Sequence, residues 1–503
     1  MSEWISATEE RSRDWQLKDL QRLCHFKRFF ERWRADSEFR ERFQIDPDGA
    51  VDQYKLQVDK ADLARYREVD LVQILTRREC DECRLPQALL DFRRCFQDAQ
   101  RQLRWERHHY APKDPRFRAW RERQIARAYS EIGSVRADEI PFATANYELA
   151  EGCSVGCWFC GVSAPPLRNL FLHTQENAAL WRDVLEVMVE LCGAESGRYH
   201  FLYNATEPFD NPDYEEFCLD FYQVVGYFPR TTTAIPLKDP ARIRAFLELG
   251  DRLGGGIDRF SILSRTMLDR VHQEFTAEEM SRVWCVFMND GAYFPKANAG
   301  RFRDRAEQRP EVIRKELGHY PPLSKAAKMV GPRILPGTIC CTAGFELNMV
   351  RQEVQLVSPC YADDRWPTGK IIHAQASFRD AEDLRKVLHV IIEEQMDVTI
   401  PTHRLVRFRR DLRFMTLPDG FELSNHLHRR LGVRNTTFAS YLAEVGQLID
   451  SGSLTAQEMA DQLLQSHAVF PAETMGFLNR LFRQGLLNEE PSSMESEQAL
   501  LSE

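Results

Sequence analysis

Residues 151–161 read EGCSVGCWFCG and place Cys153, Cys157 and Cys160 in the spacing C-x3-C-x2-C. Three thiolates in one short loop can hold three irons of a 4Fe–4S cluster, because soft sulfur ligands suit iron–sulfur chemistry. No fourth cysteine follows nearby, so the fourth iron would be open to a small ligand. Zinc usually takes four ligands in paired C-x2-C spacing, which makes a zinc knuckle or an inert thiol loop the weaker alternative.

The chain around this loop alternates short apolar runs with helical runs. Strand-like runs occur at 145–150, 201–205, 231–236, 259–263 and 283–287, and helical runs at 214–225, 239–249 and 276–282. Strands that alternate with helices form βαβ units and a parallel sheet. Because right-handed crossovers curl such units, we predict an α/β fold with a full or partial (β/α) barrel. A β-hairpin that turns at 351–353 is predicted over 344–358.

The pattern divides the chain into four parts. Residues 1–135 are predicted to form a helical N-terminal domain and 136–375 the barrel with its hairpin. In the C-terminal region, 376–487, a small α+β, winged-helix-like domain is predicted from about 404, where a hairpin turns at 418–420 and Thr455 with Glu458 fits a capping box. Residues 488–503 contain several glutamates and no Lys or Arg, which predicts a disordered acidic tail.

Charge and composition narrow the function classes. The chain has 503 residues, of which 43% are hydrophobic and 28% charged, a globular balance. The net charge of −9 argues against a nucleic-acid binder, although 91–130 is basic and predicts a solvated helical face or, alternatively, an acidic-peptide docking surface. Without a membrane-length apolar run or a signal segment, we expect a cytoplasmic protein with no membrane partner. Thirteen cysteines in a reducing compartment favour a metal site over a disulfide framework.

The cysteine loop resembles the signature of the radical S-adenosylmethionine superfamily, in which an aromatic residue precedes the third cysteine, as Phe159 does here. The resemblance implies a barrel whose first strand, 145–150, leads into the loop. It also implies that S-adenosylmethionine binds the open iron, and that one electron from an electron donor cleaves it to methionine and a 5′-deoxyadenosyl radical. Ala205, Thr206 and Glu207, followed by proline, match the family motif that contacts the methionyl amino group, usually Gly-Gly-Glu-Pro.

Three hydroxyl side chains at later strands are candidates for further cofactor contacts. Thr232 and Thr233 could bond the ribose, and Ser261 lies on a following strand. Hydroxyls that are satisfied within the strands are the alternative for all three.

Four passages, CSVGCWFCGVSA, NATEPFDNPDYEEF, GFELNMV and LVSPCYADDRWPTG, together resemble the radical S-adenosylmethionine peptide epimerases, which mature ribosomally made peptides. The resemblance covers about 140–375. Such an enzyme removes a Cα hydrogen from an L-residue of a precursor peptide, leader plus core, and returns hydrogen to the opposite face to give a D-residue. The returned atom comes from a weak S–H bond, so an unligated cysteine is required.

Cys360 is the predicted hydrogen donor, because it lies in a polar loop after a predicted strand, and Cys341 is the alternative. Cys192, Cys218 and Cys285 are predicted to be core thiols. No cysteine follows Cys360, which disfavours enzymes with auxiliary clusters. The winged-helix-like domain is a candidate for binding the leader as an added strand. Two functions stay open as alternatives: another radical peptide modification (a C–C bond, a cyclopropane or a β-carbon change) and a non-catalytic iron–sulfur peptide carrier.

Overall fold

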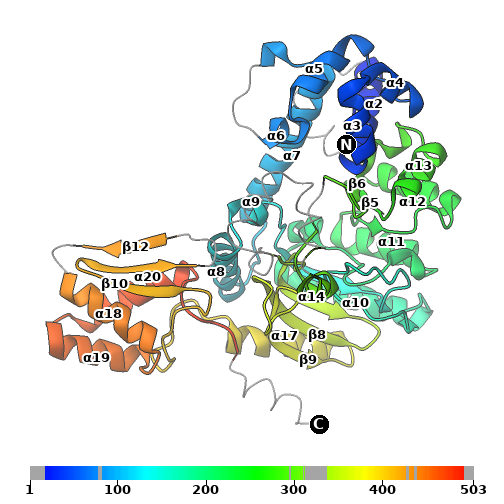
Figure 1. Cartoon of the computed structure of the whole chain (residues 1–503). Coiled ribbons are helices and arrows are strands. Elements are labelled where there is room, and N and C mark those ends of the chain that lie inside the picture. The colour runs from blue at the N-terminus through cyan, green and yellow to red at the C-terminus, as the bar shows by residue number, and fades with distance from the viewer. Residues whose placement is uncertain are drawn as a thin grey trace.

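The computed structural model describes residues 17–76, 82–293, 296–309, 311, 337–425, 430–435 and 439–491. Three hydrophobic cores organise these residues: one in the N-terminal helices, one around the central sheets and one in the C-terminal unit. Figure 1 shows the N-terminal helices at the top and the C-terminal unit to one side of the central sheets. None of the described helices is both long and apolar enough to span a membrane.

The N-terminal unit is built from helices that bury aromatic side chains against one another. Phe26 packs edge-on against Phe92 with ring centroids 5.5 Å apart, a favoured aromatic geometry. The Asp36 side chain accepts hydrogen bonds from two backbone N–H groups at the start of α3, which satisfies donors that the helix leaves open. The elements are α2 (Leu17–Ala35), α3 (Ser37–Ile45), α4 (Pro47–Gln53), η1 (Lys60–Asp62), α5 (Leu63–Glu68), α6 (Leu71–Thr76), η2 (Glu82–Arg84) and α7 (Gln87–His109).

The central unit contains a four-stranded mixed sheet in the order β1-β7-β8-β9 and a three-stranded parallel sheet in the order β4-β5-β6. β1 runs parallel to β7, whereas β8 is antiparallel to both of its neighbours. On β5, Phe260 and Ile262 enter the core while Arg259 and Ser261 face the other side, because helices cover one face of the sheet.

The strands of the central unit are β1 (Ala143–Glu148), β2 (Ala150–Glu151), β3 (Asn169–Leu170), β4 (Thr232–Thr233), β5 (Asp258–Ile262), β6 (Val283–Phe287), β7 (Thr342–Asn348), β8 (Glu353–Pro359) and β9 (Lys370–Ser377). Its helices are α8 (Pro115–Glu131), α9 (Ser134–Ala137), α10 (Gln175–Cys192), η3 (Ala194–Tyr199), η4 (Pro208–Asp210), α11 (Tyr214–Val225), α12 (Pro240–Arg252), α13 (Arg265–Glu274), η5 (Glu279–Arg282), α14 (Gly300–Gln308) and α17 (Ala381–Gln395).

Some predicted strands are confirmed and others are not. The runs at 259–263 and 283–287 form β5 and β6, and the hairpin predicted over 344–358 is formed by β7 and β8. The strand predicted at 201–205 is wrong, because this segment makes only an isolated bridge between Tyr203 and Glu148 of β1. Among the described residues neither sheet closes into a barrel, and the barrel stays a prediction.

The C-terminal unit combines a three-stranded antiparallel sheet, in the order β10-β11-β12, with three helices. The predicted hairpin at 418–420 and the capping box of Thr455 and Glu458 are both confirmed. In Figure 1, β12 lies at the outer edge of this sheet. The elements are β10 (Arg413–Leu417), β11 (Gly420–Ser424), β12 (Arg430–Arg434), α18 (Ala439–Ser451), α19 (Ala456–His467) and α20 (Pro471–Arg483).

The hydrophobic cores divide the chain at other positions than the sequence predicts. α8 falls within the predicted domain 1–135, yet its Trp120 belongs to the central core. α17 follows the predicted boundary at 375, yet its Leu384 also belongs to the central core, and the C-terminal core begins at Ile400. The packing of the central core therefore extends across the predicted boundaries at 135 and 375.

The predicted solvated basic face is wrong for α8. Arg121, Arg123 and Arg127 of this helix are buried. Arg121 donates to the backbone carbonyl of Phe142 at 2.7 Å. These guanidinium groups bind partners within the protein, so they leave little of this helix face for an acidic peptide.

The first residues of the acidic tail predicted over 488–503 are ordered. Glu489 and Glu490 are buried, and Glu489 pairs with Arg123 at 2.8 Å. The prediction of disorder is therefore wrong for 488–491, because the arginines that hold these carboxylates lie far away in the sequence. Residues 492–503 lie outside the described residues.

Candidate functional site

The cysteine loop leaves the central sheet through the short antiparallel pair of β2 and β3. Gly152 turns the chain at φ +88°, and a Cβ there would lie 2.7 Å from the Pro165 carbonyl oxygen, so this position needs glycine. The Cys153 N–H donates to the same oxygen at 2.9 Å. Ser154 donates from its N–H and its hydroxyl to the Asp210 carboxylate, at 3.0 and 2.6 Å. The loop is thus tied to the segment that contains Glu207.

The second half of the cysteine loop docks on the start of α14. Gly300 has φ +53°, and a Cβ there would lie 2.7 Å from the Cys160 carbonyl oxygen. The Arg301 N–H donates to that same oxygen at 3.0 Å. The Arg301 guanidinium donates to the carbonyl oxygens of Cys157, at 3.3 Å, and Ala164. Helix α14 therefore fixes the backbone around the second and third cysteines.

The three loop thiols have the donor chemistry of an iron–sulfur site. Cys153, Cys157 and Cys160 are each half-buried. Burial, and after it the neighbouring Cys160 and Cys153, raises the pKa of Cys157 to about 11. In the described ranges no three His, Cys, Asp or Glu side chains gather as the ligands of one ion do. Soft thiolate donors of this kind are ligands for iron–sulfur clusters and for zinc alike.

Phe159, the aromatic residue before the third cysteine, is half-buried within the loop. Its ring meets the Trp158 ring edge-on at 5.4 Å between centroids. The Lys296 ammonium lies 5.7 Å from the centroid of Phe159. Phe159 therefore contributes to packing of the loop.

The predicted amino-group motif lies beside the loop. Ala205 has φ +54°, in the left-handed region that the glycine of the family motif adopts more easily. Glu207 is buried and accepts hydrogen bonds from Thr233 Oγ1 at 2.7 Å and the Ala234 N–H at 2.8 Å. Burial raises the pKa of Glu207 to about 7, although these hydrogen bonds lower it. The carboxyl group, directly after Thr206, therefore titrates near neutral pH.

The three candidate hydroxyls differ in the hydrogen bonds that they already form within the protein. Thr233 donates to Glu207 and also accepts a hydrogen bond from the Ile235 N–H at 3.1 Å. Thr232 donates to the Tyr203 hydroxyl at 2.8 Å. Ser261 is half-buried on the face of β5 opposite to Phe260 and Ile262. The contacts of Thr233 favour the structural alternative at that position, and Thr232 and Ser261 stay candidates.

Sequence reasoning missed a polar cluster at the end of β1, directly before the cysteine loop. Glu148 accepts hydrogen bonds from Asn348 Nδ2 at 2.6 Å and Asn204 Nδ2 at 3.3 Å. Lys370 donates to Glu346 at 2.6 Å. Burial and the nearby Glu346 raise the pKa of Glu148 to about 7. The polar side chains that alternate with apolar ones along β1, and Glu346 with Asn348 in β7, were the signal that could have found this cluster.

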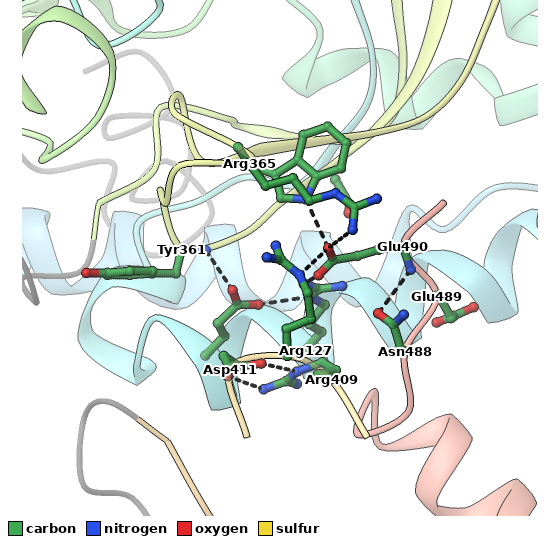
Figure 2. A network of polar contacts seen from close by, with 12 residues as sticks. Arg127, Tyr361, Arg365, Arg409, Asp411, Asn488, Glu489 and Glu490 are labelled. Carbon is green, nitrogen blue, oxygen red and sulfur yellow. Dashed lines mark hydrogen bonds and ion pairs between the residues drawn. The ribbon is translucent and has the colours of Figure 1, made fainter. Parts of the chain in front are cut away.

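Cys360 follows β8 and is buried beside a network of charges. It lines a cavity of about 270 Å³ whose walls come from α8, the 360–366 loop and the C-terminal unit. Arg127 donates to Glu131 at 2.9 Å and to Glu490 at 2.8 Å, and Figure 2 shows Arg127 beside Glu490. The Tyr361 N–H donates to Glu131 at 2.8 Å. Burial raises the pKa of Cys360 well above its ordinary value, so the sulfur stays an S–H thiol.

Cys341 lies at a different cavity. It is half-buried and lines a space of about 280 Å³ near the starts of the parallel strands, with Tyr203, Arg259 and Trp284. Burial raises the pKa of Cys341, and Arg259 opposes that effect. The predicted core thiols are confirmed as buried: Cys192, Cys218 and Cys285.

A short segment before β7 contacts both the cysteine loop and the Cys360 loop. A Cβ on Gly161 would lie 3.2 Å from the Ile339 side chain, so the two residues pack together. The Gly369 carbonyl oxygen accepts hydrogen bonds from the Thr338 hydroxyl at 2.6 Å and the Cys360 N–H at 2.9 Å. The fold therefore brings together two regions that the sequence singled out separately.

These features define a mixed α/β protein with three cores and a half-buried three-cysteine loop beside buried carboxylates. The chain is 34% identical over 473 residues to "Uncharacterized protein y4wI" of Sinorhizobium fredii, which covers 93% of this chain and 88% of that protein. The chain belongs to the same family as that rhizobial protein. No protein-family model and no solved structure matches the chain.

Proposed function

We propose that the chain is a radical S-adenosylmethionine enzyme that converts L-residues of a ribosomally made precursor peptide into D-residues. The observation that carries the proposal is the C-x3-C-x2-C loop after β1, tied through Ser154 to the segment of Glu207. Bound at Cys153, Cys157 and Cys160, a 4Fe–4S cluster with S-adenosylmethionine would supply hydrogen-atom abstraction at Cα.

Glu207 is suited to bind the amino group of the cofactor. Its carboxyl oxygens already accept hydrogen bonds from β4 and the residue that follows it, which fixes the orientation of the group. With a pKa of about 7, it is largely ionised above neutral pH and can then pair with an ammonium group. Ala205 and Thr206 lie one and two positions before it and would contribute backbone groups.

Cys360 is the proposed donor of the returning hydrogen atom. A hydrogen-atom donor must keep its S–H bond, and burial among neighbouring carboxylates keeps this thiol protonated. The atom passes from the sulfur to the planar Cα, which forms a C–H bond and leaves a thiyl. An external thiol or another one-electron reductant with a proton must then restore the S–H group. Cys341 is the alternative donor because it is half-buried at a cavity.

Single cysteine variants test this assignment, with the precursor peptide, dithionite and S-adenosylmethionine under anoxic conditions. Cys360→Ala should still release 5′-deoxyadenosine but form no D-residues. Cys341→Ala and the buried control Cys192→Ala should form them as the parent chain does. In deuterium oxide each changed residue should gain about one Da, because a thiol exchanges its hydrogen with solvent. Loss of D-residues only in Cys341→Ala would assign the role of hydrogen-atom donor to Cys341. Absence of 5′-deoxyadenosine from all proteins would favour the peptide-carrier alternative.

The C-terminal sheet supports leader binding. Within the described residues β12 pairs only with β11, so its other edge is open to an added strand. Leu431 on β12 is 41% exposed. Leu431→Glu should weaken binding of a fluorescently labelled leader peptide and leave cofactor cleavage unchanged. Unchanged leader affinity would exclude this edge.

A further inference from the structure

The outer face of the cysteine loop is exposed next to α14. Trp158, between the second and third cysteines, is 39% exposed and packs on Phe302 of α14 with ring centroids 6.0 Å apart. The Arg305 guanidinium lies 4.7 Å from the centroid of the same indole. Together with Arg301 and Arg309, Trp158 and Arg305 line a hollow of about 380 Å³. An aromatic ring and several guanidinium groups therefore share the surface over the loop.

This hollow is basic although the chain as a whole has a net charge of −9. Arg305 and Arg309 are exposed, and neither forms an ion pair with another described residue. Arg301 is directed to carbonyl oxygens of the loop, whereas Arg303, outside the hollow, pairs with carboxylates. Among the described residues that line the hollow, Asp304 is the single carboxylate. A positive excess therefore remains where the loop meets solvent.

We propose that this hollow is the docking surface for an acidic one-electron carrier protein. The inference rests on the proposed function, because that chemistry needs one electron delivered to the group held by the cysteine loop. In the step, the carrier is oxidised by one electron and the 4Fe–4S cluster is reduced by one, with no proton moved and no bond made or broken. Negative charge on the carrier matches Arg305 and Arg309, and such complementarity speeds association and fixes orientation.

The position of Trp158 favours this surface over others on the molecule. Its neighbours in the chain are Cys157 and, one residue further, Cys160. A carrier that covers the indole is therefore separated from two of the three proposed ligands by only a few covalent bonds of the polypeptide chain. The backbone there is held by Arg301, so the distance from the surface to the cysteines is fixed by the fold.

Binding of a purified acidic flavodoxin to the full-length chain tests the surface directly. Biolayer interferometry with immobilised flavodoxin should show association that weakens steeply as ionic strength rises from about 50 mM to about 500 mM. The charge reversal R305E/R309E should lower the association rate by at least about tenfold, and R305Q/R309Q by a smaller factor. The matched control R101E/K386E reverses two exposed charges on α7 and α17 and should bind as the parent chain does.

A second measurement separates this inference from the proposed function. With reduced flavodoxin as the reductant, R305E/R309E should form 5′-deoxyadenosine at least about tenfold more slowly than the parent chain, whereas with dithionite the two should be equal. Equal flavodoxin binding by R305E/R309E and the parent chain, or an equal loss in R101E/K386E, would overturn the docking surface. Absence of 5′-deoxyadenosine from every protein with dithionite would overturn the proposed function instead, and the binding result would still decide whether the hollow recognises an acidic protein.

Discussion

Replacing Glu490 by glutamine should release the C-terminal strap, residues 488–491, from α8. The Glu490 carboxylate accepts hydrogen bonds from Arg127 at 2.8 Å, Arg410 at 2.9 Å and Trp366 at 3.0 Å. Burial alone would raise the pKa of Glu490, but these donors, and Arg127 above all, lower it to about 2. Relative to the ordinary value of 4.5 for glutamate, this shift corresponds to about 3 kcal/mol of stability at pH 7.

The direction of the Glu490 pKa shift determines how this stabilisation depends on pH. The folded pKa of Glu490 is depressed, so its contribution is fully present above about pH 4.5 and is lost as the pH falls toward about 2. E490Q should therefore lower the free energy of unfolding by about 3 kcal/mol at pH 7. The difference between the variant and the parent chain should shrink below about pH 4, because the parent chain then loses the same charge.

Urea unfolding followed by tryptophan fluorescence measures this difference, with Trp366 in the network as an internal reporter. Glu382→Gln is the matched control, because Glu382 is 61% exposed and its ion pair with Arg385 should contribute less than about 1 kcal/mol. E490Q should also speed labelling of Cys360 by a thiol reagent, since Glu490 lines the same cavity. A loss in E490Q no larger than that in E382Q, constant from pH 7 to pH 3, would refute the reasoning.

Three further predictions concern backbone conformation and a buried imidazole. Ala205→Gly should raise the free energy of unfolding by up to about 1 kcal/mol in urea titration, because glycine adopts φ +54° without the clash of a Cβ. Gly300→Ala should lower the iron bound after anoxic reconstitution by more than half, since its Cβ would push away the Cys160 carbonyl. Gly476→Ala is the control, because Gly476 is a helical position with open space around the added Cβ. This variant should bind as much iron as the parent chain, and its free energy of unfolding should rise by about 1 kcal/mol. Burial lowers the pKa of His200 to about 3, so the folded protein holds the neutral imidazole. The resulting stability is fully present above pH 6.5 and is lost as the pH falls toward 3. His200→Gln should therefore make the free energy of unfolding fall less steeply over this acid range.

Local patterns in the sequence predicted the local structure well. The short apolar run at 283–287 forms β6, and Thr455 with Glu458 forms its capping box because both partners lie within one helical turn. The segment 201–205 is apolar enough to predict a strand, but it only bridges to β1. Pairing with a neighbour, which composition does not report, decides whether such a run becomes a strand.

Long-range partners were the part of the site that the sequence could not reveal. Glu489 reads as part of a charged tail, yet it is buried against Arg123, which lies 366 positions away. The cysteine spacing was visible, whereas the docking of Arg301 on the loop carbonyls depends on a helix 144 positions beyond Cys157. Charge patterning along the chain predicts solvent exposure unless opposite charges meet in space, and only the folded structure shows that they do.

The buried charges on α8 explain why the surroundings of Cys360 depend on the end of the chain. Burying an arginine such as Arg127 removes several kcal/mol of hydration, which is recovered only when carboxylates lie opposite it at hydrogen-bonding distance. Glu131 supplies one from the same helix and Glu490 the other from the strap. If the strap were displaced by one residue, an apolar contact would lose little energy. The same displacement would leave the buried Arg127 guanidinium without its carboxylate partner, which is strongly destabilising. The ion pairs therefore specify where the strap lies, and with it one wall of the cavity at Cys360.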